Sequence, residues 1–410
     1  MSGILFLAHR LPFPPDRGDK IRSHHILKAL AELAPVHVGC FAESTVEMVN
    51  EGELAGLAKS HFMPMRSKPL VLAALEAIAG GKPVSLTAFE DPQLLRWVTG
   101  TVEQHKIDTI YVFSGQMGQY VPASWRGRLI VDLVDVDSAK FEAYAPQRSA
   151  LFGWVNAREG RLLCREEARL AGRADHTLLV SEAEAELLAA RLPPGTGANI
   201  SVLGNGIDAE FFNPARTVPH EALTGPGPHF VFTGQMDYPP NAEAALRAID
   251  RLMPLVRVVH PHALFHVVGR APVPELAARD GMNGARIWGE VPDVRPFLAA
   301  ADLVLVPLAV ARGVQNKVLE AMAMARPVLM TSETATGLPG IEGVHFATAD
   351  TDLALAQRAL ALIATPAIAE KMGKAARRLV IDQRSWPAML ASLPSLVGRA
   401  TDPRGRPDDA

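Results

Sequence analysis

The sequence of 410 residues has only two cysteines, Cys40 and Cys164, and no long apolar run. Two cysteines cannot form a disulfide framework and are too few for a typical zinc site, so a reducing compartment is expected. No stretch of about 18 uninterrupted apolar residues is present, and the first residues lack the features of a signal peptide. We therefore expect a cytoplasmic protein that is neither exported nor membrane-spanning.

An excess of positive charge is also missing, since the net charge is −3 and the pI is about 6.5. Proteins that bind nucleic acid in general carry a basic footprint, so no nucleic-acid partner is expected. Hydrophobic residues make up 48% of the chain, which is enough for large cores. A length of 410 residues predicts two or three domains.

Short apolar runs alternate with helical segments along both halves of the chain. The runs are residues 4–8, 36–41, 110–113, 129–134, 230–233 and 303–308. This alternation predicts an α/β protein with two doubly wound, Rossmann-like domains.

A segment rich in proline and glycine separates the two halves and predicts a linker. The predicted boundaries are 1–212 for the first domain, 213–228 for the linker, 229–380 for the second domain, 381–400 for a helix that returns to the first domain, and 401–410 for a disordered tail.

The segment at 311–331 contains the strongest candidate site. A turn with Gly313 follows the apolar run at 303–308, and Gln315, Asn316 and Lys317 then fill the first turn of a predicted helix. Unpaired backbone N–H groups and the helix dipole favour an anion at such an N-terminus, and Lys317 adds a full positive charge. The sequence therefore predicts a phosphate site here.

Glu320 lies one helical turn after Lys317, on nearly the same face. A carboxylate in that place suits two neighbouring hydroxyls, such as those of a ribose, because it can accept both hydrogen bonds. The alternative is a helix N-terminus with a solvated Lys–Glu pair, and the local sequence leaves both interpretations open.

A second strand, glycine turn and helix N-terminus occurs near the start of the chain, where Gly18 and Lys20 follow a proline-rich loop. A plain connection is the alternative there. Asp135 and Asp137 follow the run at 129–134, and ligands of open α/β sheets bind beyond the carboxyl ends of the strands. Their D-x-D spacing also fits a metal site, but the signal is weak, and we predict no metal.

The segment at 66–82 has basic ends and an apolar middle. It fits either a surface helix that touches a membrane or a lipid-linked acceptor, or a packed helix. Because its polar face is thin, the packed helix is favoured.

Three stretches carry a resemblance to the GT-B glycosyltransferases of family 4, the group 1 glycosyl transferases. They are LGNGIDAEFFNP at 203–214, GQMDYPPN at 234–241 and GVQNKVLEAMAMARPVL at 313–329. The last two look most like the branch found in bacterial exopolysaccharide clusters, including sugar transferases associated with PEP-CTERM sorting.

The resemblance implies an acceptor domain followed by a donor domain, with Glu320 on the nucleotide and Gly234 and Gln235 beside its diphosphate. Relatives carry cations where this chain has Gln235 and Asn241. The missing charge is then expected from Lys317 and Arg270.

Two further positions depart from the family pattern. Arg312 replaces a glutamate that usually touches the sugar, and Ala325 replaces a glycine, so a left-handed turn at Ala325 would cost about 1 kcal/mol.

The resemblance implies a retaining glycosyltransferase, and we predict that it is metal-independent and uses no cofactor. It would move a sugar from a nucleotide-diphosphate sugar to a glycan or lipid-linked acceptor, with Asp135, Asp137 and Lys317 as catalytic candidates. Contact with the inner membrane at its cytoplasmic face is a further expectation. A nucleotide-sugar epimerase and a catalytically silent nucleotide-binding protein are the alternatives.

Overall fold

The computed structural model describes residues 2–144, 150–311 and 314–399, and it divides into two compact units. The first unit contains Met1–Asn205 and Met389–Ala410, and the second contains Gly206–Ala388. The chain thus enters the second unit seven residues before the predicted boundary at 212, and the proposed linker at 213–228 lies within that unit. The predicted tail at 401–410 lies outside the described residues.

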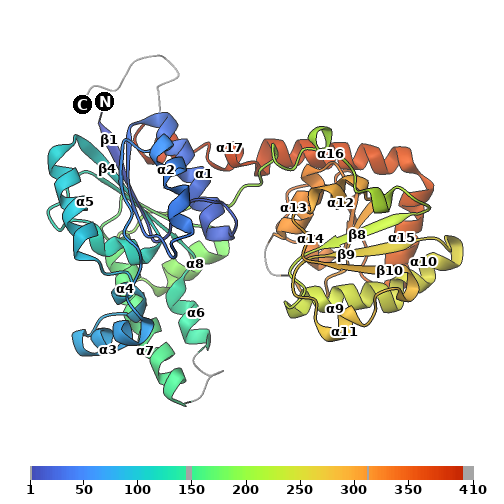
Figure 1. Cartoon of the computed structure of the whole chain (residues 1–410), viewed down its shortest axis with the longest axis horizontal. Helices are drawn as coiled ribbons and strands as arrows, with labels where there is room; N and C mark the ends of the chain where they lie inside the picture. The colour runs from blue at the N-terminus through green and yellow to red at the C-terminus, as the bar shows by residue number, and fades with distance from the viewer. Residues whose placement is uncertain (1, 145–149, 312–313, 400–410) are drawn as a thin grey trace. The chain divides into compact units, whose positions relative to one another are not determined.

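The first unit is built on a parallel sheet with the strand order β3-β2-β1-β4-β5-β6-β7 (Figure 1). Every residue of β1 and β2 is buried, which explains why these strands read as continuous apolar runs. The order reverses between β1 and β4, where ligands of such sheets bind. The strands are β1 (Gly3–Ala8), β2 (Val36–Cys40), β3 (Ser60–Phe62), β4 (Ile107–Phe113), β5 (Arg128–Val134), β6 (His176–Leu179) and β7 (Ile200–Val202).

Helices connect these strands, as parallel pairing requires. They are α1 (Gly18–Leu33), α2 (Glu51–Leu57), α3 (Leu70–Gly80), α4 (Val84–Thr87), α5 (Pro92–Gln104), α6 (Asp137–Tyr144), α7 (Ala150–Ala171) and α8 (Glu182–Arg191). Near the C-terminus, the predicted segment at 381–400 is not one helix. Residues 381–384 are the end of α16 (Pro366–Arg384), and two short helices follow, α17 (Trp386–Met389) and α18 (Leu393–Leu396).

The second unit has a six-stranded parallel sheet with the order β10-β9-β8-β11-β12-β13. The strands are β8 (His229–Thr233), β9 (Leu264–Val268), β10 (Ala285–Gly289), β11 (Leu303–Val306), β12 (Val328–Met330) and β13 (Ala347–Thr348). The helices are α9 (Pro239–Arg247), α10 (Met253–Val259), α11 (Pro274–Ala277), α12 (Arg295–Ala300), α13 (Asn316–Ala323), α14 (Ser332–Ala335), α15 (Asp352–Ala364) and α16 (Pro366–Arg384).

No single helix in the described part of the chain is long and apolar enough to cross a membrane. Only α15 and α16 together pass that test of length and composition, and they are bent by 100° at the break between them.

A buried ion pair fixes the end of the first unit's main segment. Arg22 and Asp132 are 1% and 0% exposed, and two guanidinium nitrogens of Arg22 each donate to the carboxylate at 3.1 Å. The Tyr111 hydroxyl donates to the same carboxylate at 2.9 Å. Arg22 Nη1 also donates to Asn205 Oδ1 at 3.0 Å, so this network holds the residue at which the chain leaves the unit.

The favoured interpretation of residues 66–82 as a packed helix was wrong. Only Ala73 and Ala77 of α3 are buried. The large apolar side chains are exposed, namely Leu70, Val71, Leu72, Leu75 and Ile78. The hydrophobic composition correctly predicted a helix but could not tell which neighbours the helix would have.

A chain of hydrogen bonds runs through buried histidines of the second unit. Trp288 Nε1 can only donate, so His266 Nδ1 accepts this bond at 3.1 Å. The remaining ring proton of His266 lies on Nε2 and is donated to His229 Nδ1 at 3.0 Å, and His229 Nε2 donates to the carbonyl of Gly225 at 3.1 Å. Burial, and secondarily the neighbouring His229, lowers the pKa of His266 to about 3.

We predict that His266 makes the protein lose stability in mild acid. The unfolded chain binds a proton at this position below its ordinary pKa of 6.5, whereas the folded chain does not until about pH 3. Stability is therefore fully present above pH 6.5 and falls as the pH drops towards 3. Urea unfolding of the His266→Gln variant between pH 5 and 7 should show a mean pH slope about 1 kcal/mol per unit smaller than that of the wild type. Equal slopes would contradict this assignment.

Candidate functional site

The amine of Lys317 lies at the start of α13, and the side chain is only 9% exposed. Nζ donates a hydrogen bond to Oδ1 of Asn241 in the first turn of α9 and lies 4.9 Å from the centre of the Phe232 ring. The amide of Asn241 in turn donates to the backbone carbonyl of Gln235 at 2.9 Å, which directs Oδ1 towards the lysine. Lys317 is therefore held by a neutral amide and an aromatic face.

No acidic side chain among the described residues forms an ion pair with Lys317. Burial lowers the pKa of Lys317 to about 8, and the charge of Glu320 opposes that shift only in part. A partly desolvated cation without a paired anion is unfavourable, and a bound anion would relieve this cost. The site is thus prepared for negative charge.

Glu320 lies one turn further along α13 and is half-buried. Within the part of the chain that the structure describes, its carboxylate has no hydrogen-bond or ion-pair partner. Burial raises the pKa of Glu320 to about 7, although the nearby Lys317 charge lowers it. A ligand with two neighbouring hydroxyls would supply the missing donors and favour the ionised form.

Two glycines allow the carboxyl ends of β8 and β9 to approach each other closely. A Cβ on Gly269 would lie 1.6 Å from the carbonyl oxygen of Gly234, which no side chain can tolerate. A Cβ on Gly234 would lie 2.9 Å from the Asn241 amide nitrogen and 3.3 Å from Lys317 Nζ. Gly234 therefore leaves the space in front of the lysine open.

Hydrogen bonds link Arg270 to the same edge of the sheet. Its guanidinium is exposed and donates from Nη2 to Gln235 Oε1 at 2.9 Å. The structure thus brings Gly234, Gln235, Arg270 and Lys317 together at the carboxyl ends of β8 and β9, as predicted.

The remaining predicted residues of this loop and helix are placed as follows. Gln315 is the N-cap residue of α13, and Asn316 is exposed in its first turn. Gly313 and Arg312 lie outside the described residues. At the other end of α13, Ala325 has a φ of 54°, so the expected left-handed turn without glycine is confirmed.

Sequence reasoning missed the partners of Lys317. Asn241 was interpreted as a position that had lost a cation, but its amide oxygen anchors the cation supplied by α13. Phe232 was expected only as part of a buried strand, yet its ring lies against the same amine. No local signal pairs these residues with Lys317, because they come from different segments of the chain.

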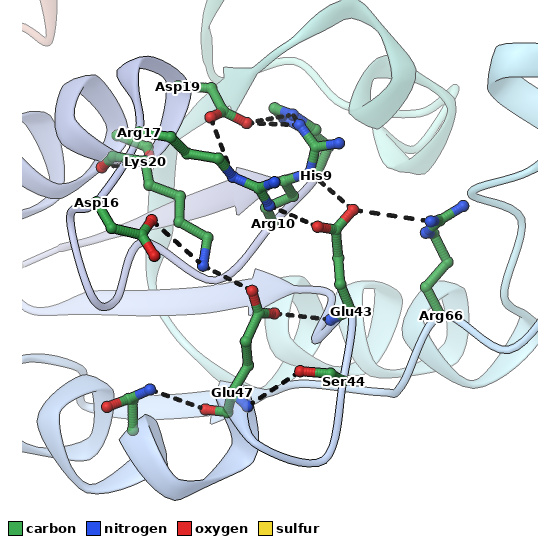
Figure 2. A network of polar contacts seen from close by, with 12 residues as sticks. His9, Arg10, Asp16, Arg17, Asp19, Lys20, Glu43, Ser44, Glu47 and Arg66 are labelled. Carbon is green, nitrogen blue, oxygen red and sulfur yellow. Dashed lines mark hydrogen bonds and ion pairs between the residues drawn. The ribbon is translucent and has the colours of Figure 1, made fainter. Parts of the chain in front are cut away.

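Lys20 is not free to neutralise a phosphate. Its side chain is 2% exposed, and Nζ lies 2.6 Å from Glu47 and 3.9 Å from Asp16 (Figure 2). Arg10 bridges Asp19 and Glu43 in the same network at 2.6 and 2.8 Å. The predicted phosphate role of Lys20 is therefore corrected to an ion pair within the first unit.

Gly18 begins α1, and a Cβ there would meet nothing within 4 Å. The described residues around this position therefore leave room for a side chain.

Asp135 and Asp137 share one lysine. Lys140 Nζ lies 2.8 Å from Asp135 and 3.3 Å from Asp137, and all three side chains are partly exposed. No group of three or more potential metal-ligating side chains occurs among residues 2–144, 150–311 and 314–399. Both aspartates line a small hollow at the strand ends, and Gln116 lines the same hollow.

Backbone strain marks this edge of the first sheet. Ser114 after β4 has a φ of 76°, and Val134 at the end of β5 has a φ of 69°. A positive φ is uncommon for serine and rare for a β-branched residue, and such strain gathers at functional sites. The carboxyl edge of β4 and β5 is thus a second candidate binding region.

A larger hollow of about 880 Å³ lies elsewhere on the second unit. Its lining includes His229 and Asp302, at the amino ends of β8 and β11, and Lys374 of α16. Ligands of parallel sheets bind at the carboxyl ends, so size alone does not make this hollow the site.

Comparisons with known proteins found one family model that matches part of the chain. Residues 227–365 match the family model of the group 1 glycosyl transferases. No curated protein matches the chain.

Similar solved structures cover nearly the whole chain. Anabaena Alr3699/HepE, solved in complex with UDP and glucose, is 16% identical with a TM-score of 0.61, covering 98% of this chain and 100% of its own. Sucrose-phosphate synthase from Thermosynechococcus elongatus is 15% identical with a TM-score of 0.59, covering 97% and 99%. WaaG, a glycosyltransferase involved in lipopolysaccharide biosynthesis, is 16% identical with a TM-score of 0.59, covering 96% and 100%.

At such low identity, these structures show the fold. Both units have the parallel sheet and interleaved helices of a Rossmann-like domain, and the matched segment lies within the second unit. The chain therefore has the two-domain GT-B fold, and its second unit carries a segment that matches the group 1 glycosyl transferases.

Proposed function

We propose that this protein is a glycosyltransferase that uses a nucleotide-diphosphate sugar as its donor. One observation carries the proposal: α13 presents a buried cation and a carboxylate one turn apart, and neither forms an ion pair with any described residue. The cation suits a diphosphate and the carboxylate suits a ribose diol. The match of residues 227–365 and the UDP or UDP-glucose bound to the similar Anabaena structures support this interpretation.

The diphosphate would be bound by three kinds of donor. Lys317 supplies a buried charge, and Arg270 supplies an exposed one. The backbone N–H groups of the first turn of α13 would supply the third. Together they compensate for the neutral residues Gln235 and Asn241 at positions where relatives carry cations.

The reaction would break the bond between the anomeric carbon and the β-phosphate oxygen, and the nucleoside diphosphate would leave with the electron pair. The acceptor hydroxyl oxygen forms the new bond to the anomeric carbon, with configuration retained, and its proton passes to the leaving phosphate. Lys317 and the helix N–H groups stabilise the charge that develops on that phosphate.

The acceptor would bind the first unit at the carboxyl edge of β4 and β5. Asp135 and Asp137 would orient its hydroxyl there, with Lys140 holding both carboxylates. We propose a glycan or lipid-linked acceptor in bacterial exopolysaccharide or glycoconjugate synthesis. The reaction would take place in the cytoplasm, at the inner face of the inner membrane.

Incubation with a panel of UDP- and GDP-sugars tests the function. Transfer or slow hydrolysis supports a glycosyltransferase. Conversion of the sugar without release of nucleotide would indicate an epimerase. Binding without turnover for every donor and acceptor would indicate a silent nucleotide-binding protein.

We predict that nucleotide-sugar affinity is highest between about pH 7 and pH 8. Below this window Glu320, whose pKa is about 7, becomes protonated and loses one acceptor function. Above it Lys317, whose pKa is about 8, loses its charge. A nucleotide sugar is the right ligand for this measurement because the charge of its diphosphate diester stays constant in this pH range. Any change of affinity with pH therefore comes from the protein. Calorimetry from pH 6 to 9 measures the profile.

The Glu320→Gln variant should lose the acid limb of this profile, and its affinity at pH 7.5 should fall by about 1 to 3 kcal/mol. Glu243→Gln, which changes an exposed carboxylate on α9, is the matched control. An unchanged profile in the Glu320 variant would exclude it as the diol acceptor.

We predict that Lys317→Ala lowers turnover by about two orders of magnitude, the size of effect seen when one transition-state donor is removed. Gln235→Ala should have a smaller effect, and Lys371→Ala, an exposed lysine of α16, should have none. Steady-state kinetics measures all three. Normal turnover without Lys317, combined with inactivity of Arg270→Ala, would move the phosphate site to another loop.

We predict that activity survives incubation with EDTA, because Lys317 and the helix N–H groups neutralise the diphosphate. Asp135 and Asp137 are paired with Lys140 instead of being available to a metal. The measurement is the transfer rate before and after chelation. Complete loss that Mn²⁺ or Mg²⁺ reverses would assign these two aspartates as metal ligands.

A further inference from the structure

Helix α3 exposes an apolar surface that the fold of the first unit does not use. Its five large apolar residues are each between 47% and 74% exposed, namely Leu70, Val71, Leu72, Leu75 and Ile78. An ordinary surface helix turns such residues inward and its polar residues outward. Here two alanines face the unit, so the water-facing side of α3 is its most hydrophobic side.

Helix α7 holds α3 in this position. Arg158 of α7 donates to the carbonyl of Ala77 at 2.8 Å and to that of Lys82 at 3.0 Å, which caps the C-terminal end of α3. One residue further on, Glu159 accepts hydrogen bonds from the backbone N–H groups of Val84 and Ser85 at 2.7 and 2.8 Å. The exposed face therefore belongs to a well-supported helix, and Figure 1 shows α3 and α7 at the same end of the first unit.

Positive charge borders the apolar surface. Arg158, Arg161 and Arg165 follow one another at spacings of three and four, so they line one face of α7, and the exposed Trp154 precedes them by one turn. Arg161 and Arg165 are exposed and form no ion pair with any residue that the structure describes. These side chains and the five apolar residues of α3 are called the α3–α7 surface below.

A hollow of about 410 Å³ joins the two parts of this surface. It is lined by Ile78 and Gly81 at the end of α3, and by Leu162 and the three arginines of α7. None of its lining residues in the described part of the chain is acidic. Guanidinium groups bind phosphate in a bidentate manner, while Ile78 and Leu162 offer contact to hydrocarbon. This combination matches a phospholipid headgroup with the first part of its acyl chains.

The charge argues against a second copy of the chain as the occupant. In a twofold dimer both copies contribute the same patch, so the interface would bring together the positive charge of both copies. An anionic bilayer offers the complementary charge instead. Tryptophan and arginine side chains also suit the membrane interface, where one end of the side chain lies in water and the other in hydrocarbon.

We propose that the α3–α7 surface docks the first unit on an anionic phospholipid bilayer. The apolar residues of α3 enter the boundary between headgroups and acyl chains, while Arg161 and Arg165 contact lipid phosphates. This proposal rests on the proposed function only for its consequence, which is to bring a lipid-linked acceptor to the enzyme. The surface belongs to the first unit and the nucleotide residues belong to the second, so each can be tested alone.

Flotation of the full chain with vesicles tests the proposal. Vesicles of phosphatidylcholine and phosphatidylglycerol should bind the protein, and vesicles of phosphatidylcholine alone should bind it far less. Val71→Glu with Leu75→Glu, and separately Arg161→Glu with Arg165→Glu, should each lower binding by about tenfold or more. Val71→Ser with Leu75→Ser is the milder apolar variant.

Matched controls change the same chemistry elsewhere. Val258→Glu with Val259→Glu alters two exposed valines of α10, and Arg358→Glu with Lys371→Glu reverses two exposed charges of the second unit. Both controls should bind vesicles like the wild type. Circular dichroism and thermal unfolding of every variant report correct folding of the first unit. Nucleotide-sugar affinity should be unchanged in every variant, which separates this test from that of the proposed function.

Three results would overturn the proposal. The first is equal binding of the wild type to both kinds of vesicle, and the second is undiminished binding by the α3 and α7 variants. The third is a wild-type oligomer, seen by light scattering, that becomes a monomer when α3 is changed. The last result would assign the surface to contact between copies of the chain.

Discussion

The candidate site depends on the position of one cation. Lys317 is almost fully buried, and the groups around it, Asn241 and Phe232, are neutral. In water its charge would be solvated at no cost, but here burial lowers its pKa to about 8. The protein thus maintains a region of unsatisfied positive potential at a helix N-terminus, and an anion is the natural complement.

The pKa of Glu320, on the same helix, is shifted in the opposite direction to that of Lys317. Burial raises its pKa to about 7, which disfavours the ionised carboxylate in the free protein. One helix therefore presents a lysine and a glutamate whose charged forms are both disfavoured by burial. A ligand with a negative charge would stabilise the charged form of Lys317, and its diol would stabilise the charged form of Glu320. The affinity would therefore depend on both contacts.

In the first unit, the buried cations are paired with carboxylates. Its buried cations Arg22 and Lys20 pair with Asp132 and Glu47, so these charges stabilise the fold instead of remaining available to an anion. What it leaves unsatisfied is hydrophobic surface on α3. The two units thus differ in what they offer a ligand: the second offers charge within a sheet edge, and the first offers apolar surface bordered by arginines.

The sequence by itself determined the local features of this protein. The alternation of apolar runs gave both parallel sheets, the spacing of Lys317 and Glu320 put them on one helix, and Ala325 adopted the left-handed turn that its position required. Such features depend on backbone geometry and on residues a few positions apart. Only the tertiary structure decided the partners of buried charges and the exposure of α3. Lys317 meets Asn241 from 76 residues away and Lys20 meets Glu47 from 27 residues away, and the energy of a charge depends on these distant neighbours and on the water they exclude.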